Sequence, residues 1–209
     1  MNSSTRKLML AGPAGAIEAV RDEPAPGQPV RGVAVIAHPH PLFGGTMDNK
    51  VVQTLARAFT QCGWSAVRFN FRGVGASAGV HDEGRGETDD LVQVLQQVAP
   101  TGPLALAGFS FGSFVVSRAL AALWDARAVE KIVLVGTAAA HFEVAGLPPD
   151  AHPRTLVIHG EQDDTVPLSA VFDWARPQSL PVTVIPGGSH FFHGQLPLLK
   201  NLVVRHLQS

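Results

Sequence analysis

The stretch Gly108-Phe109-Ser110-Phe111-Gly112 decides the fold of this chain. It follows the apolar run 104–107 and precedes the helix-like run 113–123. A serine between two glycines, placed between a strand and a helix, is typical of a nucleophile elbow, a tight turn that holds the serine in a strained backbone conformation. Side chains at the two glycine positions would collide with the strand or the helix. The pattern is weak by itself, so the rest of the sequence has to support it.

Length and composition narrow the range of functions. The 209 residues predict one domain over 1–209 with a single sizeable core. The formal net charge is −1, so we expect no basic surface for nucleic acid or for an anionic membrane. Cys62 is the only cysteine, which excludes an internal disulfide and favours a cytoplasmic location. No apolar run is long enough to span a bilayer or to form the core of a signal peptide.

Apolar strands alternate with helical segments along the chain. Two short strands at 7–10 and 16–21 flank a glycine-containing turn and predict an N-terminal hairpin. Continuous apolar runs then predict strands buried on both faces at 32–37, 65–69, 104–107, 131–135, 155–158 and 182–185. We therefore predict the α/β class, a three-layer sandwich with a mostly parallel central sheet and an antiparallel N-terminal hairpin at one edge.

Three chemically distinctive residues follow three of these strands. Ser110 follows the strand at 104–107, Asp163 follows the strand at 155–158, and His190 follows the strand at 182–185. The carboxyl ends of parallel strands meet at one edge of a sheet, so these side chains are expected close together. A serine hydroxyl needs a base to remove its proton and an acid to orient that base. We expect Ser110 as nucleophile, His190 as base and Asp163 as orienting acid.

The negative charge that forms on an attacked carbonyl oxygen needs two N–H donors. The first should be the backbone N–H of Phe111, directly after the nucleophile. The second should come from the loop 38–47, where the two prolines have no N–H to offer. That leaves His40, Leu42 or Phe43, and Leu42 is our choice for this oxyanion hole.

Two neighbouring residues compete for these roles. Asp164 stands beside Asp163, but Asp163 lies three residues after a glycine and before a Val-Pro pair, which suits an acid loop better. Asp164 is expected to cap the next helix or to face solvent. His193 competes with His190, but the glycines before His190 suit a loop that brings its backbone close to the elbow. His193 is expected at the surface.

Further polar residues at the same edge have structural interpretations. His38 and His40 have no cysteine or carboxylate nearby at ligand spacing, so no metal site is predicted, and both are expected to shape the loop 38–47. The glycine-rich loop that begins at Arg72 lacks the lysine and the spacing of a phosphate-binding P-loop. Arg72 is expected to pair with an acid at 82, 83 or 87.

The next helix is expected to begin at Thr88. Asp89 and Asp90 are then interpreted as acids of its first turn, where the helix macrodipole favours negative charge.

With these residues in view, the chain resembles the α/β-hydrolase superfamily over nearly its whole length, and is most similar to the small, capless bacterial serine hydrolases related to dienelactone hydrolase. The resemblance is carried by His38–Met47, Asn70–Gly75, Gly108–Gly112, His159–Asp163 and Gly187–His190. It implies the α/β-hydrolase fold, a Ser110–Asp163–His190 triad in the order usual for that superfamily, and activity on esters. Dienelactone hydrolase carries a cysteine nucleophile, so the serine here favours ordinary esters or thioesters over a lactone.

The combined expectation is a serine esterase that cleaves small carboxylic esters through an acyl-enzyme on Ser110, with no cofactor. About twenty residues separate the strands ending at Val135 and starting at Thr155, too few for a lid domain. A shallow, open pocket for small or protruding acyl groups is therefore expected. A thioesterase or another acyl hydrolase is the alternative, and a non-catalytic binding protein is the alternative from another class. The expected partner is a small-molecule ester, while the acyl chain length and the oligomeric state are left open.

Overall fold

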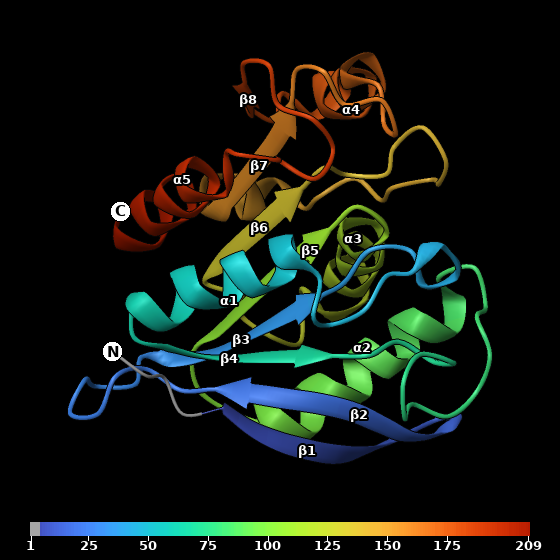
Figure 1. Ribbon diagram of the computed structural model, residues 1–209, viewed down its shortest axis with the longest axis vertical. Helices are drawn as coiled ribbons and strands as arrows, with labels where there is room; N and C mark the ends of the chain where they lie inside the picture. Colours follow the sequence, from blue (N-terminus) through green and yellow to red (C-terminus); the bar gives the residue numbers. More distant parts are fainter. Residues whose placement is uncertain (1–4) are drawn as a thin grey trace.

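The computed structural model describes residues 5–209, in which one eight-stranded sheet lies between two layers of helices (Figure 1). The strands are β1 Thr5–Gly12, β2 Gly15–Asp22, β3 Gly32–Ala37, β4 Trp64–Phe69, β5 Leu104–Phe109, β6 Lys131–Val135, β7 Thr155–Gly160 and β8 Val182–Ile185. The α-helices are α1 Lys50–Gln61, α2 Arg85–Val98, α3 Phe111–Leu123, α4 Leu168–Ala175 and α5 Leu196–Gln208. Short 3₁₀ helices are η1 Pro41–Phe43, η2 Pro149–Arg154 and η3 Arg176–Gln178.

The sheet has the strand order β1-β2-β4-β3-β5-β6-β7-β8. The hairpin β1–β2 is antiparallel and joins β4 in antiparallel pairing, whereas all other neighbours are parallel. The predicted fold class, with its antiparallel N-terminal edge, is therefore confirmed. The chain steps from β3 outward to β4 and then returns to place β5 on the other side of β3. Ligands in open α/β sheets bind where the strand order reverses in this way.

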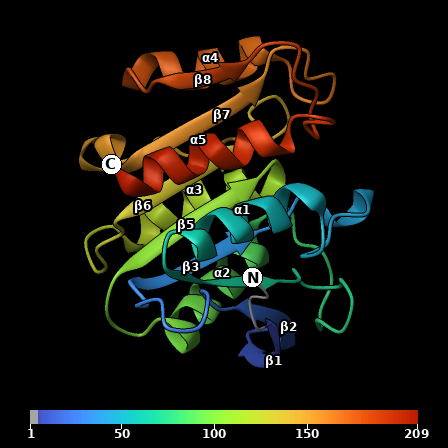
Figure 2. The same cartoon turned by 60° about the vertical axis from the view of Figure 1, so that its left-hand side comes forward.

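The two helix layers bury separate cores. Helices α1 and α5 lie side by side on one face, where the core includes Phe59, Trp64 and Phe192. Figure 2 shows these two helices in front of the sheet. Helices α2 and α3 cover the other face together with α4, around a core that includes Phe71 and Phe111. Every residue of β5 is buried, as expected of a central strand covered on both faces.

Side chains near the first turn determine where α1 and α2 begin. Asn49 caps α1, because its side-chain oxygen accepts a hydrogen bond from the N–H of Val51 at 2.8 Å. Helix α2 begins at Arg85, so the expected start at Thr88 is wrong by three residues. The reason is Glu87, whose carboxylate reaches back to accept the N–H of Gly84 at 2.8 Å and so stabilises an earlier first turn.

In the part of the chain that the structure describes, no lid domain covers the carboxyl edge of the sheet. The connection from β6 to β7 spans residues 136–154 and contains only η2, which agrees with the expectation from its length. Within residues 5–209, none of the helices combines the length and the apolar character needed to cross a bilayer.

Candidate active site

The turn between β5 and α3 places Ser110 at the carboxyl edge of the sheet. Ser110 has φ 56° and ψ −118°, a conformation that non-glycine residues rarely adopt. Its N–H donates to the carbonyl of Val135 at 2.8 Å, and its own carbonyl accepts the N–H of Ser113 at 2.9 Å. A Cβ added at Gly108 would lie 2.5 Å from the backbone nitrogen of Ser113. The expected steric need for glycine beside this serine is therefore confirmed.

The structure brings together the three residues that the sequence proposed from separate strand ends. The Ser110 Oγ lies 3.0 Å from Nε2 of His190, and Nδ1 of His190 lies 2.6 Å from Oδ2 of Asp163. All three residues are buried. A carboxylate only accepts hydrogen bonds, so Nδ1 of the neutral imidazole carries the proton and Nε2 is left to accept the serine hydroxyl. This arrangement can move a proton from Ser110 to His190.

Asp163 is held as an anion. Its Oδ1 accepts the backbone N–H groups of Thr165 at 2.9 Å and Val166 at 2.7 Å, which leaves Oδ2 for His190. Burial by itself would raise the pKa of Asp163, but the hydrogen bonds from His190 and Val166 outweigh it, and the net pKa is lowered. The competing residues lie elsewhere, because Asp164 and His193 are both exposed.

Aromatic rings and one glycine shape the space around His190. The rings of Phe109 and Phe191 lie with their centroids 5.0 and 5.1 Å from that of the imidazole. Gly136, at the end of β6, has φ 55°, and a Cβ there would lie 3.2 Å from Cε1 of His190. Gly136 was not singled out in the sequence, although a glycine directly after a buried strand is a signal for close backbone approach.

His38 fixes the start of the loop that follows β3. Its Nδ1 donates to the carbonyl of Pro39 at 2.6 Å, and its Nε2 accepts the N–H of Phe71 at 2.9 Å. Burial lowers the pKa of His38 to about 4, so the ring stays neutral. In a trans peptide the C=O and N–H point in opposite directions. By binding the Pro39 carbonyl, His38 therefore orients the N–H of His40, which belongs to the same peptide.

His40 and Leu42 have different positions relative to the site. The N–H of Leu42 donates to Nδ1 of His40 at 3.2 Å, and Leu42 is 69% exposed. His40 lines the pocket, and its ring centroid lies 4.9 Å from that of Phe111. Burial lowers the pKa of His40, which keeps Nδ1 available as an acceptor. His40 thus lines the same pocket as Ser110, whereas Leu42 is not among the residues that line it.

A pocket of about 600 Å³ opens over Ser110. This volume suits a ligand of moderate size. Its wall is mostly apolar, with no Asp, Glu, Lys or Arg among the residues that line it. These residues are Pro39, His40, Phe43, Gly44, Gly45, Asn49, Ser110, Phe111, Ala138, His141, Phe142, Thr165, His190 and Phe191.

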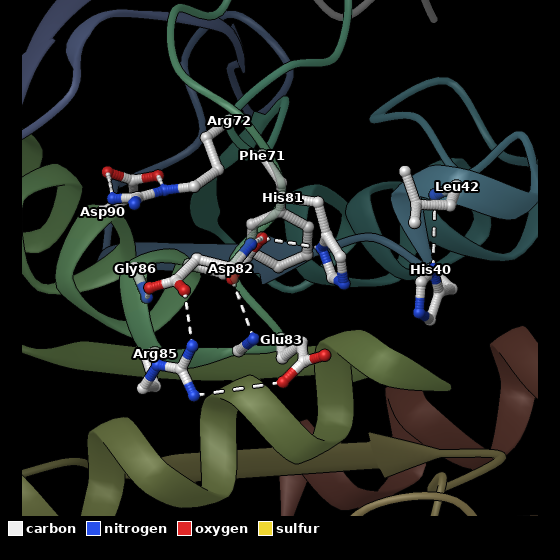
Figure 3. A network of polar contacts seen from close by, with 12 residues as sticks. His40, Leu42, Phe71, Arg72, His81, Asp82, Glu83, Arg85, Gly86 and Asp90 are labelled. Atoms are coloured by element: carbon white, nitrogen blue, oxygen red, sulfur yellow. Dashed lines mark hydrogen bonds and ion pairs between the residues drawn. The ribbon is translucent and has the colours of Figure 1, made fainter.

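A network of polar contacts stabilises the loop 70–84 and the start of α2 beside this pocket (Figure 3). Arg72 makes two hydrogen bonds of 2.8 Å to the buried carboxylate of Asp90. The expected pairing of Arg72 with 82, 83 or 87 is therefore wrong, and so is the interpretation of Asp90 as a first-turn acid. Glu87 instead accepts Nδ1–H of His81 at 2.8 Å, and the His81 ring packs against His40 at 4.8 Å. Through this contact between His81 and His40, the polar network supports the loop after β3.

Metal-ligating residues do not gather in the described part of the chain, where no group of three or more His, Cys, Asp or Glu could hold an ion. Both ring nitrogens of His38 are engaged by backbone groups.

Comparisons with known proteins agree with this architecture. Residues 28–145 match the profile of a family described as "Serine aminopeptidase, S33". Uncharacterized protein RP471 of Rickettsia prowazekii (strain Madrid E) is 30% identical over 198 residues, which cover 89% of this chain and 82% of the relative.

Two solved structures are closely similar over almost their full lengths. XC6422 from Xanthomonas campestris, described as an a/b serine hydrolase without lid, has a TM-score of 0.88 and 36% identity, covering 100% of this chain and 95% of its own. An alpha-beta serine hydrolase homologue from Coxiella burnetii has a TM-score of 0.83 and 36% identity, covering 99% of each chain. By its sequence profile and its fold, the chain belongs to the S33 serine aminopeptidase family of the α/β-hydrolase superfamily.

Proposed function

We propose that this hydrolase is a serine esterase in which Ser110 is the nucleophile, His190 the base and Asp163 the orienting acid. The observation that carries the proposal is the continuous chain of hydrogen bonds Ser110–His190–Asp163, 3.0 and 2.6 Å long, at the floor of a pocket. A packing role alone would not require a serine in a strained turn to face an imidazole that a buried carboxylate orients.

The geometry supports a two-step reaction. His190 accepts the hydroxyl proton as Ser110 Oγ attacks the ester carbonyl, and Asp163 stabilises the imidazolium that forms. His190 then gives the proton to the leaving alcohol, which leaves an acyl group on Ser110. A water molecule, deprotonated by the same imidazole, attacks the acyl carbonyl and releases the acid. The serine is restored with its proton.

The pocket favours uncharged, largely apolar esters. An aminopeptidase must bind the charged α-amino group of its substrate, yet no Asp or Glu lines this pocket. No Lys or Arg lines it either, so phosphates of a large thioester carrier have no cationic partner there. We therefore place carboxylic esters ahead of peptides and of phosphorylated thioesters as substrates. The volume of about 600 Å³ accommodates acyl groups longer than acetyl.

Covalent labelling tests the proposed function. A fluorophosphonate is expected to label the wild-type protein once, on the peptide that contains Ser110, because the reagent needs a serine activated by a base. The same preparation should hydrolyse uncharged 4-nitrophenyl esters. Labelling should persist in Ser113→Ala, a change at a buried serine three residues away. A wild-type protein that is folded but neither labelled nor active would leave the non-catalytic binding protein as the better interpretation.

The second oxyanion donor is proposed to be the N–H of His40 in place of that of Leu42. Leu42 donates its N–H to the His40 ring, whereas the N–H groups of His40 and Phe111 have no hydrogen-bond partner in residues 5–209. His40 has φ −53°, which proline can adopt. His40→Pro removes the N–H, and His40→Ala removes only the ring. We expect kcat of His40→Pro to be lower than that of His40→Ala by roughly 10²- to 10³-fold.

Steady-state kinetics on both variants, with active sites counted by the fluorophosphonate, measures this difference. Equal kcat values for the proline and alanine variants would exclude the His40 N–H as a donor.

A further inference from the structure

A second histidine lies buried beneath the candidate acid and takes no part in the proposed proton transfer. His159 is the fifth residue of β7, is fully buried, and stands four residues before Asp163. The sequence places it in the segment 159–163 that carries the resemblance, but assigns it no role.

The ring of His159 has a defined tautomer. Its Nε2 lies 2.8 Å from the carbonyl oxygen of Val166 and 3.4 Å from Oδ2 of Asp163. Both neighbours are acceptors, so Nε2 carries the proton. Burial lowers the pKa of His159, which keeps the ring neutral. Its Nδ1 is buried and has no hydrogen-bond partner among the described residues 5–209.

The unpartnered Nδ1 indicates why a histidine occupies this place. A buried polar atom without a partner costs about 1–3 kcal/mol, so packing alone would favour an apolar side chain here. The feature that compensates is the N–H at Nε2. It points to the carbonyl of the same Val166 whose N–H donates to Oδ1 of Asp163 at 2.7 Å. His159 thereby ties the acid turn 163–166 to the end of β7.

The same N–H lies near the carboxylate oxygen that binds the base. Oδ2 of Asp163 accepts Nδ1–H of His190 at 2.6 Å and has Nε2 of His159 at 3.4 Å on another side. A carboxylate held on Oδ1 by two backbone N–H groups can still pivot about that oxygen. A donor beside Oδ2 opposes this movement.

We propose that His159 is a positioning residue, whose Nε2–H holds the turn 163–166 so that Oδ2 of Asp163 stays aligned with His190. The inference rests on the proposed function, because it concerns the acid of the same site. His159 contacts neither the substrate nor the reacting atoms, so it acts only through Asp163.

Two variants separate the N–H from the bulk of the ring. His159→Gln keeps an amide N–H that can reach the Val166 carbonyl, and His159→Leu fills similar space without a donor. We expect His159→Leu to lower kcat roughly 10- to 100-fold at unchanged KM, as for a small misplacement of a reacting group. The acid limb of its kcat/KM profile should move to lower pH, because Asp163 then stabilises the protonated base less. His159→Gln should stay close to wild type in kcat and in the position of the acid limb.

A readout without substrate keeps this inference separate from the proposed function. The far-downfield proton resonance of the His190 Nδ1–H in its bond to Asp163 should be present in wild type and His159→Gln, and lost or broadened in His159→Leu. If the wild-type protein lacks esterase activity, the proposed function fails while this resonance still decides the role of His159. If His159→Leu does not fold, His159→Asn, whose shorter amide falls short of Val166, takes its place. A donor-free variant with the wild-type resonance, kcat and acid limb would overturn the proposal.

Discussion

Replacing Ser110 with alanine is expected to lower kcat/KM for ester hydrolysis by roughly 10⁴- to 10⁶-fold. The variant loses the only hydroxyl that lies within 3.0 Å of Nε2 of His190 among the described hydrogen bonds. A residual rate above that in water should survive, because binding in the pocket and the two proposed oxyanion N–H donors do not depend on the serine side chain. The measurement is ester turnover at saturating and subsaturating substrate.

Ser113→Ala is the matched control for that change. Ser113 is also buried, but its Oγ donates to the carbonyl of Gly108 at 2.7 Å and so belongs to the structure of the elbow. Losing this hydrogen bond should cost about 1 kcal/mol of unfolding free energy and leave kcat/KM within about tenfold of wild type. If Ser110→Ala turned over esters as fast as Ser113→Ala, Ser110 would not be the nucleophile.

The parts of the site that depend on short-range pattern could be predicted from the sequence. Ser110, Asp163 and His190 each follow a strand within a few residues, and a parallel sheet then brings the ends of these strands to one edge. The elbow glycine Gly108 could be predicted as well, because the steric conflict it avoids arises between residues at most five positions away.

The parts that depend on long-range packing could not be predicted. Arg72 pairs with Asp90 rather than with an acid that is nearer in sequence. Helix α2 begins three residues earlier than expected, so Asp90 lies beyond its first turn and is buried. Three candidates for the second oxyanion donor were open, and our proposal of His40 rests on the hydrogen bond between its ring and the N–H of Leu42. The orientation of the His40 ring could not be predicted from the sequence, because it depends on how the loop after β3 packs against Phe111.

Gly112 joins the elbow to the loop after β3, and its replacement should damage both stability and activity. A Cβ at Gly112 would lie 2.7 Å from the carbonyl oxygen of His38 and closer still to the carbonyl of Ala37. Both are backbone atoms, so they can give way only if α3 or the end of β3 moves. We expect Gly112→Ala to lower the unfolding free energy by about 1–3 kcal/mol, as overpacking does. Because the Pro39–His40 peptide, which follows closely after His38, carries the proposed oxyanion donor, kcat should also fall roughly 10²-fold.

Gly146→Ala provides the control, because a Cβ at that exposed glycine would meet no atom within 4 Å and its φ is not positive. It should change the unfolding free energy by less than about 0.5 kcal/mol and leave kcat unaltered. Urea unfolding and turnover per labelled site measure both quantities on the same preparations. Should Gly112→Ala match Gly146→Ala in both, the close contact of α3 with the end of β3 would not govern the site. A loss of stability with unchanged kcat would instead separate the packing of the elbow from the alignment of the oxyanion donor.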